Sequence, residues 1–413
     1  MKEKIIQHLD HPEEIEKLYR ANKSSFKKSF SAIEADYSNH IVVQCWKARL
    51  ENRKNEINWG SLNNFIWLLV LCTFTSILAK LPSIFSISEE TYYSRNIGFI
   101  LFPSLCIYFS SVQRLSVKKN TFIFIFIVSA VIFINLLPDA RKSDTLILSC
   151  IHFPLLLWSL LGFSFTGNEL FSVDKRMSFL RYNGDLLVLS AIILIAGGIL
   201  TGITIGLFSL INMDISEFYF KYVVVAGLSS CPLLASYIIQ HNPGLVNRIS
   251  PIIAKIFTPL VLVTLVFYLF AIFTAGKNPY TDREFLLTFN LLLIGVMALI
   301  FFSLTEIKSG NGKGYMILLF LLSLTTILVN LIALSAILFR ISEWGFSPNR
   351  ITVLGGNVLI LINLILVAFR LVKVVFYRYP YQSVNEATTQ FLPLYTVWSF
   401  VVSFIFPFLF SFR

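Results

Sequence analysis

The sequence is short of charged residues. Asp, Glu, Lys and Arg make up 14% of the 413 residues, whereas hydrophobic residues make up 56%. Soluble domains carry about 25% charged and 45–50% apolar residues, so this composition excludes an ordinary soluble domain and predicts a membrane protein. The net charge of +11 is explained by basic residues that flank membrane helices and face anionic lipid. We therefore expect the lipid bilayer as a partner and no nucleic acid.

Sequence motifs for catalysis, nucleotides and metals are also lacking. The five cysteines, at 45, 72, 106, 150 and 231, are scattered without a CxxC pair, which favours packing roles. GxxxxGK[ST], HExxH and GxSxG are absent, and the glycine-rich turn at 310–314 has no strand or Ser/Thr beside it. No catalytic residue, metal ligand or cofactor is predicted, and we expect no enzyme activity.

Residues 1–60 form the one sizeable polar segment. Pro12 and Glu13 are typical of a helix start, and Ile15, Leu18 and Tyr19 then share one face. A second helix is expected near 39–52. No apolar signal sequence precedes residue 61. We interpret this prefix as a small soluble helical domain, followed by a transmembrane domain at 61–413.

Hydropathy predicts an all-α, polytopic transmembrane helical bundle with about eleven spans. The expected spans are 62–80, 97–113, 120–138, 145–166, 184–212, 218–240, 255–275, 284–305, 315–338, 350–372 and 392–411.

The distribution of Lys and Arg predicts the orientation. With the N-terminus inside, cytoplasmic segments hold about 24 of these residues and outer segments about 10. The N-terminus is therefore expected in the cytoplasm and Arg413 outside it. The outer loops are all short, which argues against lipid-linked sugar polymerases and transferases with a large catalytic outer loop.

A run without charges from 186 to 213 carries glycines at regular intervals. Gly198, Gly202 and Gly206 are spaced four apart, and the next span repeats the spacing with small residues. Such residues let two membrane helices approach closely. The sequence therefore predicts a tightly packed hairpin over 182–241. Its packing residues are Gly198, Gly202, Gly206, Gly227, Cys231 and Ala235.

Few ionisable residues fall inside the spans, and each is a candidate functional group. Asp185 lies four residues after Arg181, and we expect an ion pair between them at the cytoplasmic interface. His152 is expected to bond a neighbouring carbonyl. Amides can hydrogen-bond across helix contacts or line a polar cavity; those at depth are Asn290, Asn330, Asn357 and Asn363.

The segment from Arg340 to Asn357 has the pattern of a turn that enters a helix. Ser347 is a good N-cap, Pro348 a good first helical residue, and Gly345 permits a sharp turn. Arg350 would then lie in the first turn, where it is expected to pair with Glu343. Glu343, Ser347, Asn349, Arg350 and Asn357 are the candidate functional residues of this segment.

The Gly-x-Ser-x-Asn-Arg turn, with Asn357 two helical turns further on, resembles a large family of multi-pass bacterial inner-membrane proteins catalogued as a domain of unknown function. The glycine-rich span after residues 181–184 is also similar, so the resemblance covers about 175–380. The prefix, with Leu18 to Arg20 and Trp46 to Leu50, looks like the short helical prefix of some relatives. The resemblance implies a bacterial inner-membrane location and no established activity.

Two functions remain open at this stage. The first is a non-enzymatic bundle that binds or transports a small or lipid-like substrate. The alternative is an assembly or signalling protein whose residues 1–60 dock a cytoplasmic partner. A membrane enzyme acting on headgroups through Glu343, Asn349 and Arg350 is disfavoured, since no nucleophile or metal set accompanies them. Substrate and oligomeric state cannot be derived from the sequence.

Overall fold

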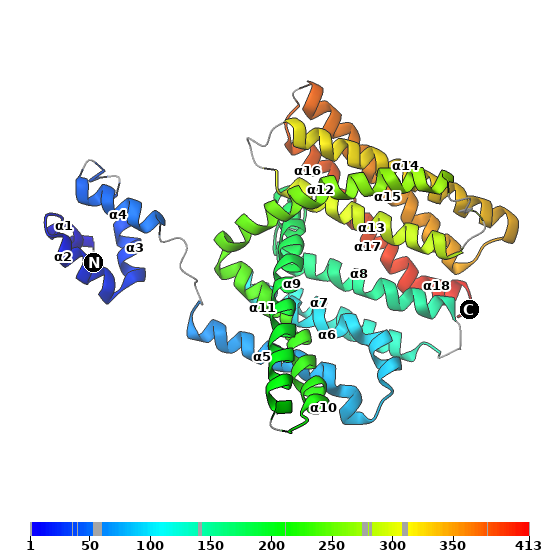
Figure 1. Ribbon diagram of the computed structural model, residues 1–413, viewed down its shortest axis with the longest axis horizontal. Coiled ribbons are helices and arrows are strands. Elements are labelled where there is room, and N and C mark those ends of the chain that lie inside the picture. The colour runs from blue at the N-terminus through cyan, green and yellow to red at the C-terminus, as the bar shows by residue number, and fades with distance from the viewer. Residues whose placement is uncertain are drawn as a thin grey trace. The chain divides into compact units, whose positions relative to one another are not determined.

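The computed structural model describes residues 2–34, 36–38, 40–52, 60–138, 143–210, 212–274, 280, 283–307, 313–377 and 379–412. Most of the predicted 310–314 turn lies outside these residues. All regular secondary structure in the described residues is helical (Figure 1), which confirms the all-α prediction. The chain divides into two compact units, Met1–Trp59 with Asn242–Leu245, and Gly60–His241 with Val246–Arg413.

The first unit has its own hydrophobic core. Its helices are α1 (Lys2–Gln7), α2 (Pro12–Ala21), α3 (Lys23–Ser31) and α4 (Ile41–Asn52). The predicted helix start at Pro12 is confirmed, and Ile15 and Tyr19 are fully buried. Phe26 stacks on Phe30 and packs against Trp46. These aromatic contacts join α2, α3 and α4 into one cluster.

One carboxylate connects the polar faces of α2 and α4. Glu16 accepts hydrogen bonds from Arg20 on its own helix (2.8 Å) and from Arg49 of α4 (2.9 Å). These hydrogen bonds hold the pKa of Glu16 below its ordinary value. The pair between helices is partly shielded, because the Arg49 guanidinium lies 4.5 Å from the centroid of the Trp46 ring.

The second unit contains the remaining helices, among which are the membrane-spanning ones. These are α5 (Leu62–Phe85), α6 (Glu89–Val112), α7 (Val117–Leu136), α8 (Asp144–Thr166), α9 (Val173–Leu210), α10 (Ser216–Phe218), α11 (Val225–His241), α12 (Pro243–Thr274), α13 (Arg283–Thr305), α14 (Lys313–Trp344), α15 (Pro348–Tyr377), α16 (Gln382–Thr389), α17 (Leu392–Phe400) and α18 (Phe406–Leu409). Two π-helical turns, Tyr219–Val224 and Val401–Ile405, join α10 to α11 and α17 to α18.

Ten segments among the described residues are long and apolar enough to cross a membrane, with Ser216–His241 and Gln382–Leu409 each taken as one. Helix α13 adds a shorter apolar stretch, Phe289–Thr305. Together they correspond to the eleven predicted spans. The molecule is therefore a multi-pass α-helical membrane protein. Most helices extend beyond the predicted limits, since hydropathy detects the apolar part of a helix and not its polar ends.

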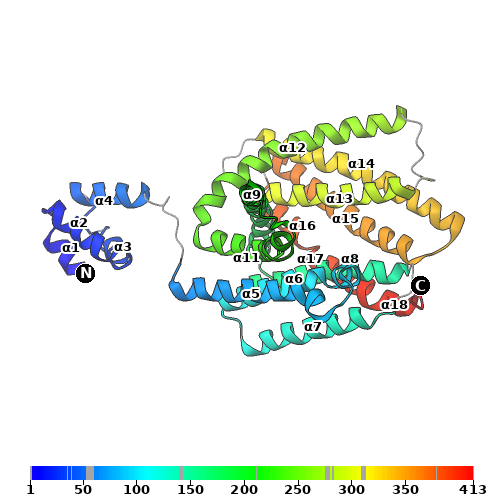
Figure 2. The same cartoon turned by 60° about the horizontal axis from the view of Figure 1, so that its bottom comes forward.

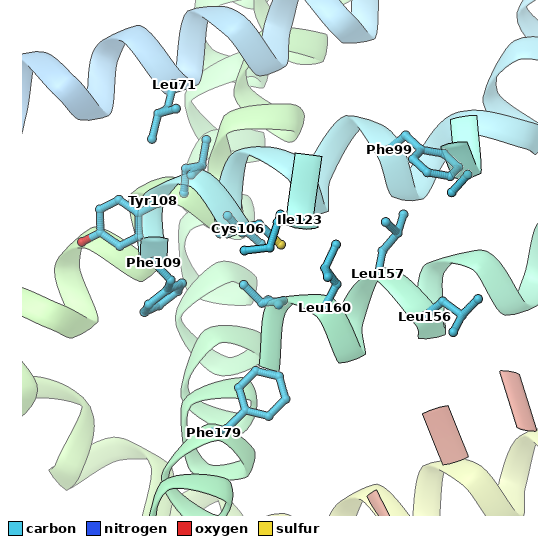
Figure 3. Close-up of a cluster of buried hydrophobic side chains, with 14 of the residues drawn as sticks. Leu71, Phe99, Cys106, Tyr108, Phe109, Ile123, Leu156, Leu157, Leu160 and Phe179 are labelled. Carbon is cyan, nitrogen blue, oxygen red and sulfur yellow. The ribbon is translucent and has the colours of Figure 1, made fainter. Parts of the chain in front are cut away.

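The membrane unit has two hydrophobic halves. One core joins α5, α6, α7, α8 and α11, and Figure 3 shows part of it, with Cys106 of α6 and Leu160 of α8 in the same cluster. The other core joins α12, α13, α14, α15 and α16. The beginning of α9 contributes to both, because Phe179 packs in the first core and Leu180 in the second. Trp158 of α8 packs against both cores.

Helix α9 crosses α8 instead of running beside it, as Figures 1 and 2 show from two directions. A crossing helix is covered only near the crossing point. The buried residues of α9 accordingly all lie in its first half, from Met177 to Asp185. The apolar second half has no buried residue.

The prediction for the glycine stripe is therefore wrong at four positions. A Cβ atom placed at Gly198, Gly202, Gly206 or Gly227 would meet no atom within 4 Å. The close contact of α9 with α11 lies nearer the crossing, where Cys231 and Ala235 are buried and Cys231 Sγ lies 3.6 Å from the Ser190 carbonyl oxygen. The hairpin is thus packed closely at one end, and the four glycines of its other end lie in no close helix contact.

Candidate functional site

The turn between α14 and α15 has the predicted local structure. Gly345 adopts φ +73°, a left-handed conformation that glycine reaches without strain. The Ser347 hydroxyl accepts a hydrogen bond from the backbone N–H of Arg350 (3.4 Å), which is the predicted N-cap. This cap fixes where α15 begins and places Asn349 and Arg350 in its first turn.

The predicted pairing of Arg350 is wrong. Arg350 Nη1 donates to the backbone carbonyl oxygens of Trp344 (2.8 Å) and Gly345 (2.7 Å) at the end of α14. Its guanidinium lies 5.7 Å from the centroid of the Trp344 ring. Glu343 is exposed and makes no ion pair with another residue that the structure describes. Unsatisfied carbonyls at a helix C-terminus attract a cation, so they take the place of the Glu343 carboxylate.

Amide side chains connect four helices, α13, α14, α15 and α17. Asn357 of α15 donates through Nδ2 to Asn290 Oδ1 of α13 (2.8 Å), and Asn330 of α14 donates to the Asn357 carbonyl oxygen (3.2 Å). Asn363 of α15 donates to the Tyr395 hydroxyl of α17 (3.0 Å). All four predicted asparagines therefore hydrogen-bond between helices. Asn330 is fully buried, and its Oδ1 has no hydrogen-bond partner among the described residues.

A cavity of about 1410 Å³ lies between the two halves of the membrane unit, where α8 and α9 meet α13 and α15. Its wall is mostly apolar. The polar side chains in its lining are Asp144, His152, Trp158, Asn183, Asn290, Arg340, Ser347, Asn349, Arg350, Thr352, Asn357, Tyr395, Trp398 and Ser399. Its volume exceeds the 300–1,000 Å³ or so typical of sites for small molecules. The cavity is large enough for an extended molecule.

The predicted site residues divide into two groups with respect to this cavity. The structure brings five together in its wall, although they come from two helices and one turn: Asn290, Ser347, Asn349, Arg350 and Asn357. Glu343, Asp185 and Asn330 do not belong to the lining. Asn330 supports the wall indirectly through the Asn357 carbonyl.

The charged groups of the lining gather at one end of the cavity. Asp144 begins α8, Arg340 lies near the end of α14, and Arg350 lies in the first turn of α15. Figure 1 shows the start of α8 and the α14–α15 turn at the same end of the membrane unit. Arg340 is 9% exposed, and its Nε donates to the Tyr280 carbonyl oxygen (3.1 Å). Two cations and one carboxylate give this end a net positive charge.

Two tryptophans belong to the aromatic part of the wall, and neither was predicted from the sequence. Trp158 Nε1 donates to Asn183 Oδ1 (2.9 Å), so one hydrogen-bond donor is satisfied. Trp398 Nε1 is buried without a hydrogen-bond partner among the described residues, and a Cβ at Gly356 would lie 4.0 Å from it. His152 Nδ1 lies 2.8 Å from the Leu148 carbonyl oxygen, which agrees with the predicted structural imidazole.

The predicted ion pair between Arg181 and Asp185 is also wrong. Arg181 Nε lies 3.2 Å from Glu306 Oε1, just after the end of α13, and its guanidinium donates to the Thr305 carbonyl oxygen. Glu306 is 5% exposed and was not identified from the sequence. Because α9 crosses α13 here, the nearest acceptors for Arg181 come from another helix. Asp185 lies one turn further along α9 and is buried.

A second buried cation lies in the other half of the unit and was likewise missed. Arg95 of α6 donates through Nη1 to the carbonyl oxygens of Ile134 (3.1 Å) and Leu137 (3.0 Å) at the end of α7. Beside it, Asn96 and Asn135 exchange two amide hydrogen bonds of 3.0 and 2.9 Å. These contacts join α6 to α7 and lie away from the cavity lining.

Within the described residues, no three His, Cys, Asp or Glu side chains are arranged to hold a metal ion. Comparison of the chain with protein-family models, with curated proteins and with solved structures gave no match. The resemblance to the bacterial inner-membrane family therefore stays a prediction. What the fold and the cavity define is a multi-pass helical membrane protein with a large, mostly apolar cavity whose lining is positively charged at one end.

Proposed function

We propose that this protein binds an amphiphilic, lipid-like molecule in the cavity, with an anionic group at the end that carries Arg340 and Arg350. The observation that carries the proposal is the combination of a long apolar wall with two arginines at one end. A guanidinium binds carboxylate or phosphate through two parallel hydrogen bonds. In Arg350 the hydrogen bonds to the end of α14 use Nη1, and Nη2 and Nε make none among the described residues.

The proposal is tested with a spin-labelled fatty acid and its uncharged methyl ester as probes. Trp158 and Trp398 line the cavity, so the bound nitroxide should quench their fluorescence in a saturable way. Gly356→Leu and Gly295→Leu add a side chain to the wall at positions where a Cβ meets no close atom. We expect each to raise the Kd of the acid at least about tenfold, which is about 1.4 kcal/mol.

The matched control is Gly202→Leu, the same substitution at an equally open position of α9 outside the cavity. Its Kd should equal that of the parent protein. Arg350→Lys keeps the charge and loses the planar guanidinium donor. It should therefore weaken binding of the fatty acid more than binding of the methyl ester. Saturable quenching that Gly356→Leu leaves unchanged would place the probe elsewhere and reject the cavity as the binding site.

An alternative function rests on a different observation, the separate core of residues 1–59. A small folded unit on a membrane domain can dock a cytoplasmic partner, as assembly and signalling proteins require. Deleting residues 1–55 distinguishes the two functions. A deletion that reproduces the whole knockout phenotype supports the docking function, whereas retained function supports the cavity.

We also propose a bacterial inner-membrane location with a cytoplasmic N-terminus and an outer C-terminus, based on the Lys and Arg distribution and the family resemblance. An odd number of spans puts the termini on opposite sides. Alkaline phosphatase fused after Arg413 should be active, and a fusion near Tyr379 should be inactive. The reverse pattern would mean that one apolar helix does not cross the membrane.

A further inference from the structure

A buried carboxyl group lies next to the cavity wall on α9. Asp185 is 6% exposed, makes no ion pair, and its Oδ1 has no hydrogen-bond partner among the described residues. The preceding residues Asn183 and Gly184 line the cavity, as does Leu187. Asp185 itself is not part of the cavity lining. A carboxylate buried without a partner is costly and usually marks a functional group in a membrane protein.

The surroundings of Asp185 contain one cation, which is already engaged. Among the described residues, Arg181 is the charged side chain that lies close enough to Asp185 to interact with it electrostatically. The Arg181 guanidinium forms an ion pair with Glu306 and donates a hydrogen bond to the Thr305 carbonyl oxygen. Tyr381 of α16, which also lies near Arg181, donates to the Leu304 carbonyl oxygen (2.6 Å). From α11, the Ser236 hydroxyl is hydrogen-bonded to Tyr182 (2.7 Å).

The remaining polar neighbour is a second buried oxygen without a hydrogen-bond partner. Ser250 of α12 is fully buried, its hydroxyl lies beside the Asp185 carboxyl group, and its Oγ makes no hydrogen bond of ordinary geometry among the described residues. An added proton removes the buried negative charge, and the protonated carboxyl group can still hydrogen-bond to Ser250, because it can donate to a serine hydroxyl oxygen. A metal ion would need more oxygen ligands than this pair supplies.

We propose that Asp185 is a proton-binding site, in which the protonated carboxyl group bridges α9 to Ser250 of α12. The proton adds to a carboxylate oxygen and leaves it again without any other bond breaking. When the proton leaves, the new carboxylate competes with Glu306 for Arg181, four residues earlier on the same helix. Proton release therefore exchanges one ion pair for another beside the cavity wall, and this is a two-state switch.

Infrared spectroscopy of the full-length protein in detergent at pH 8 tests the proposal. Exposed carboxyl groups are ionised at this pH. We expect one carboxylic-acid C=O stretching band that shifts in D2O, disappears in Asp185→Asn, and persists in Glu306→Gln. In Ser250→Ala the band should move to higher wavenumber, because the carboxyl group loses its hydrogen-bond acceptor.

Two results would overturn the proposal: no protonated-carboxyl band in the parent protein, or a band that Asp185→Asn leaves in place. Thermal unfolding of each variant shows whether it is folded. If Asp185→Asn does not fold, the spectra of the parent protein and of Ser250→Ala still test the proposal. A carboxylic-acid band that Ser250→Ala leaves unchanged would belong to another group and would contradict the proposal. The result does not depend on the identity of the cavity ligand.

Discussion

Gly184→Leu is expected to prevent stable folding, whereas Gly202→Leu is expected to be tolerated. A Cβ at Gly184 would overlap the ring of Phe302, where α9 crosses α13. Overpacking a tight contact costs about 1–3 kcal/mol for small additions, and a whole leucine side chain exceeds this. At Gly202 the added side chain meets open space, and leucine favours the helix over glycine by roughly 0.5–1 kcal/mol.

Expression yield, size-exclusion profile and thermal unfolding in detergent measure the difference between these two variants. Gly184→Ala gives a graded version of the same test, because it adds the Cβ atom alone, and we expect a lower Tm with a retained fold. Equal tolerance of leucine at 184 and 202 would contradict the crossing of α9 over α13. Loss of folding at 202 alone would restore the glycine-stripe prediction.

The positions of the membrane helices could be predicted from the sequence because the bilayer demands long apolar segments. Their contacts could not. Gly198, Gly202 and Gly206 share one face by spacing, but spacing does not say whether another helix lies on that face. The close approaches occur at Gly184 and Gly355 instead, where a Cβ would overlap Phe302 and Trp398. Neither glycine belongs to a repeated small-residue pattern in the sequence analysis.

The local structure of single segments of the candidate site could be predicted from the sequence, but the way the segments come together could not. The Ser347 cap follows from residues three apart, and local chemistry of this kind can be read from sequence. The cavity forms where α8, α9 and α13 cross. No local sequence pattern therefore identifies Trp158, Asn183 and Trp398 as residues of its lining. Both mistaken ion pairs have one cause. Both predictions joined an arginine, Arg350 or Arg181, to an acid near in sequence, whereas backbone carbonyls and Glu306 lie closer in the fold.

Glu306→Ala is expected to destabilise the protein by about 3 kcal/mol through the loss of one partner of a buried ion pair. This value is at the low end for such pairs, because the Arg181 side chain is 36% exposed while that of Glu306 is 5% exposed. The cost arises from leaving the guanidinium uncompensated. Arg181→Met should cost a similar amount, since it removes the guanidinium that lies 3.2 Å from the buried Glu306 carboxylate.

The double variant Arg181→Met with Glu306→Leu removes both charges, so its free energy of unfolding should recover to within about 1 kcal/mol of the parent protein. Chemical denaturation of the four proteins in one detergent gives the coupling energy directly. Additive losses in the double variant would contradict a direct pair between α9 and the end of α13. Recovery would show that the charges of Arg181 and Glu306 balance each other at the crossing of α9 and α13.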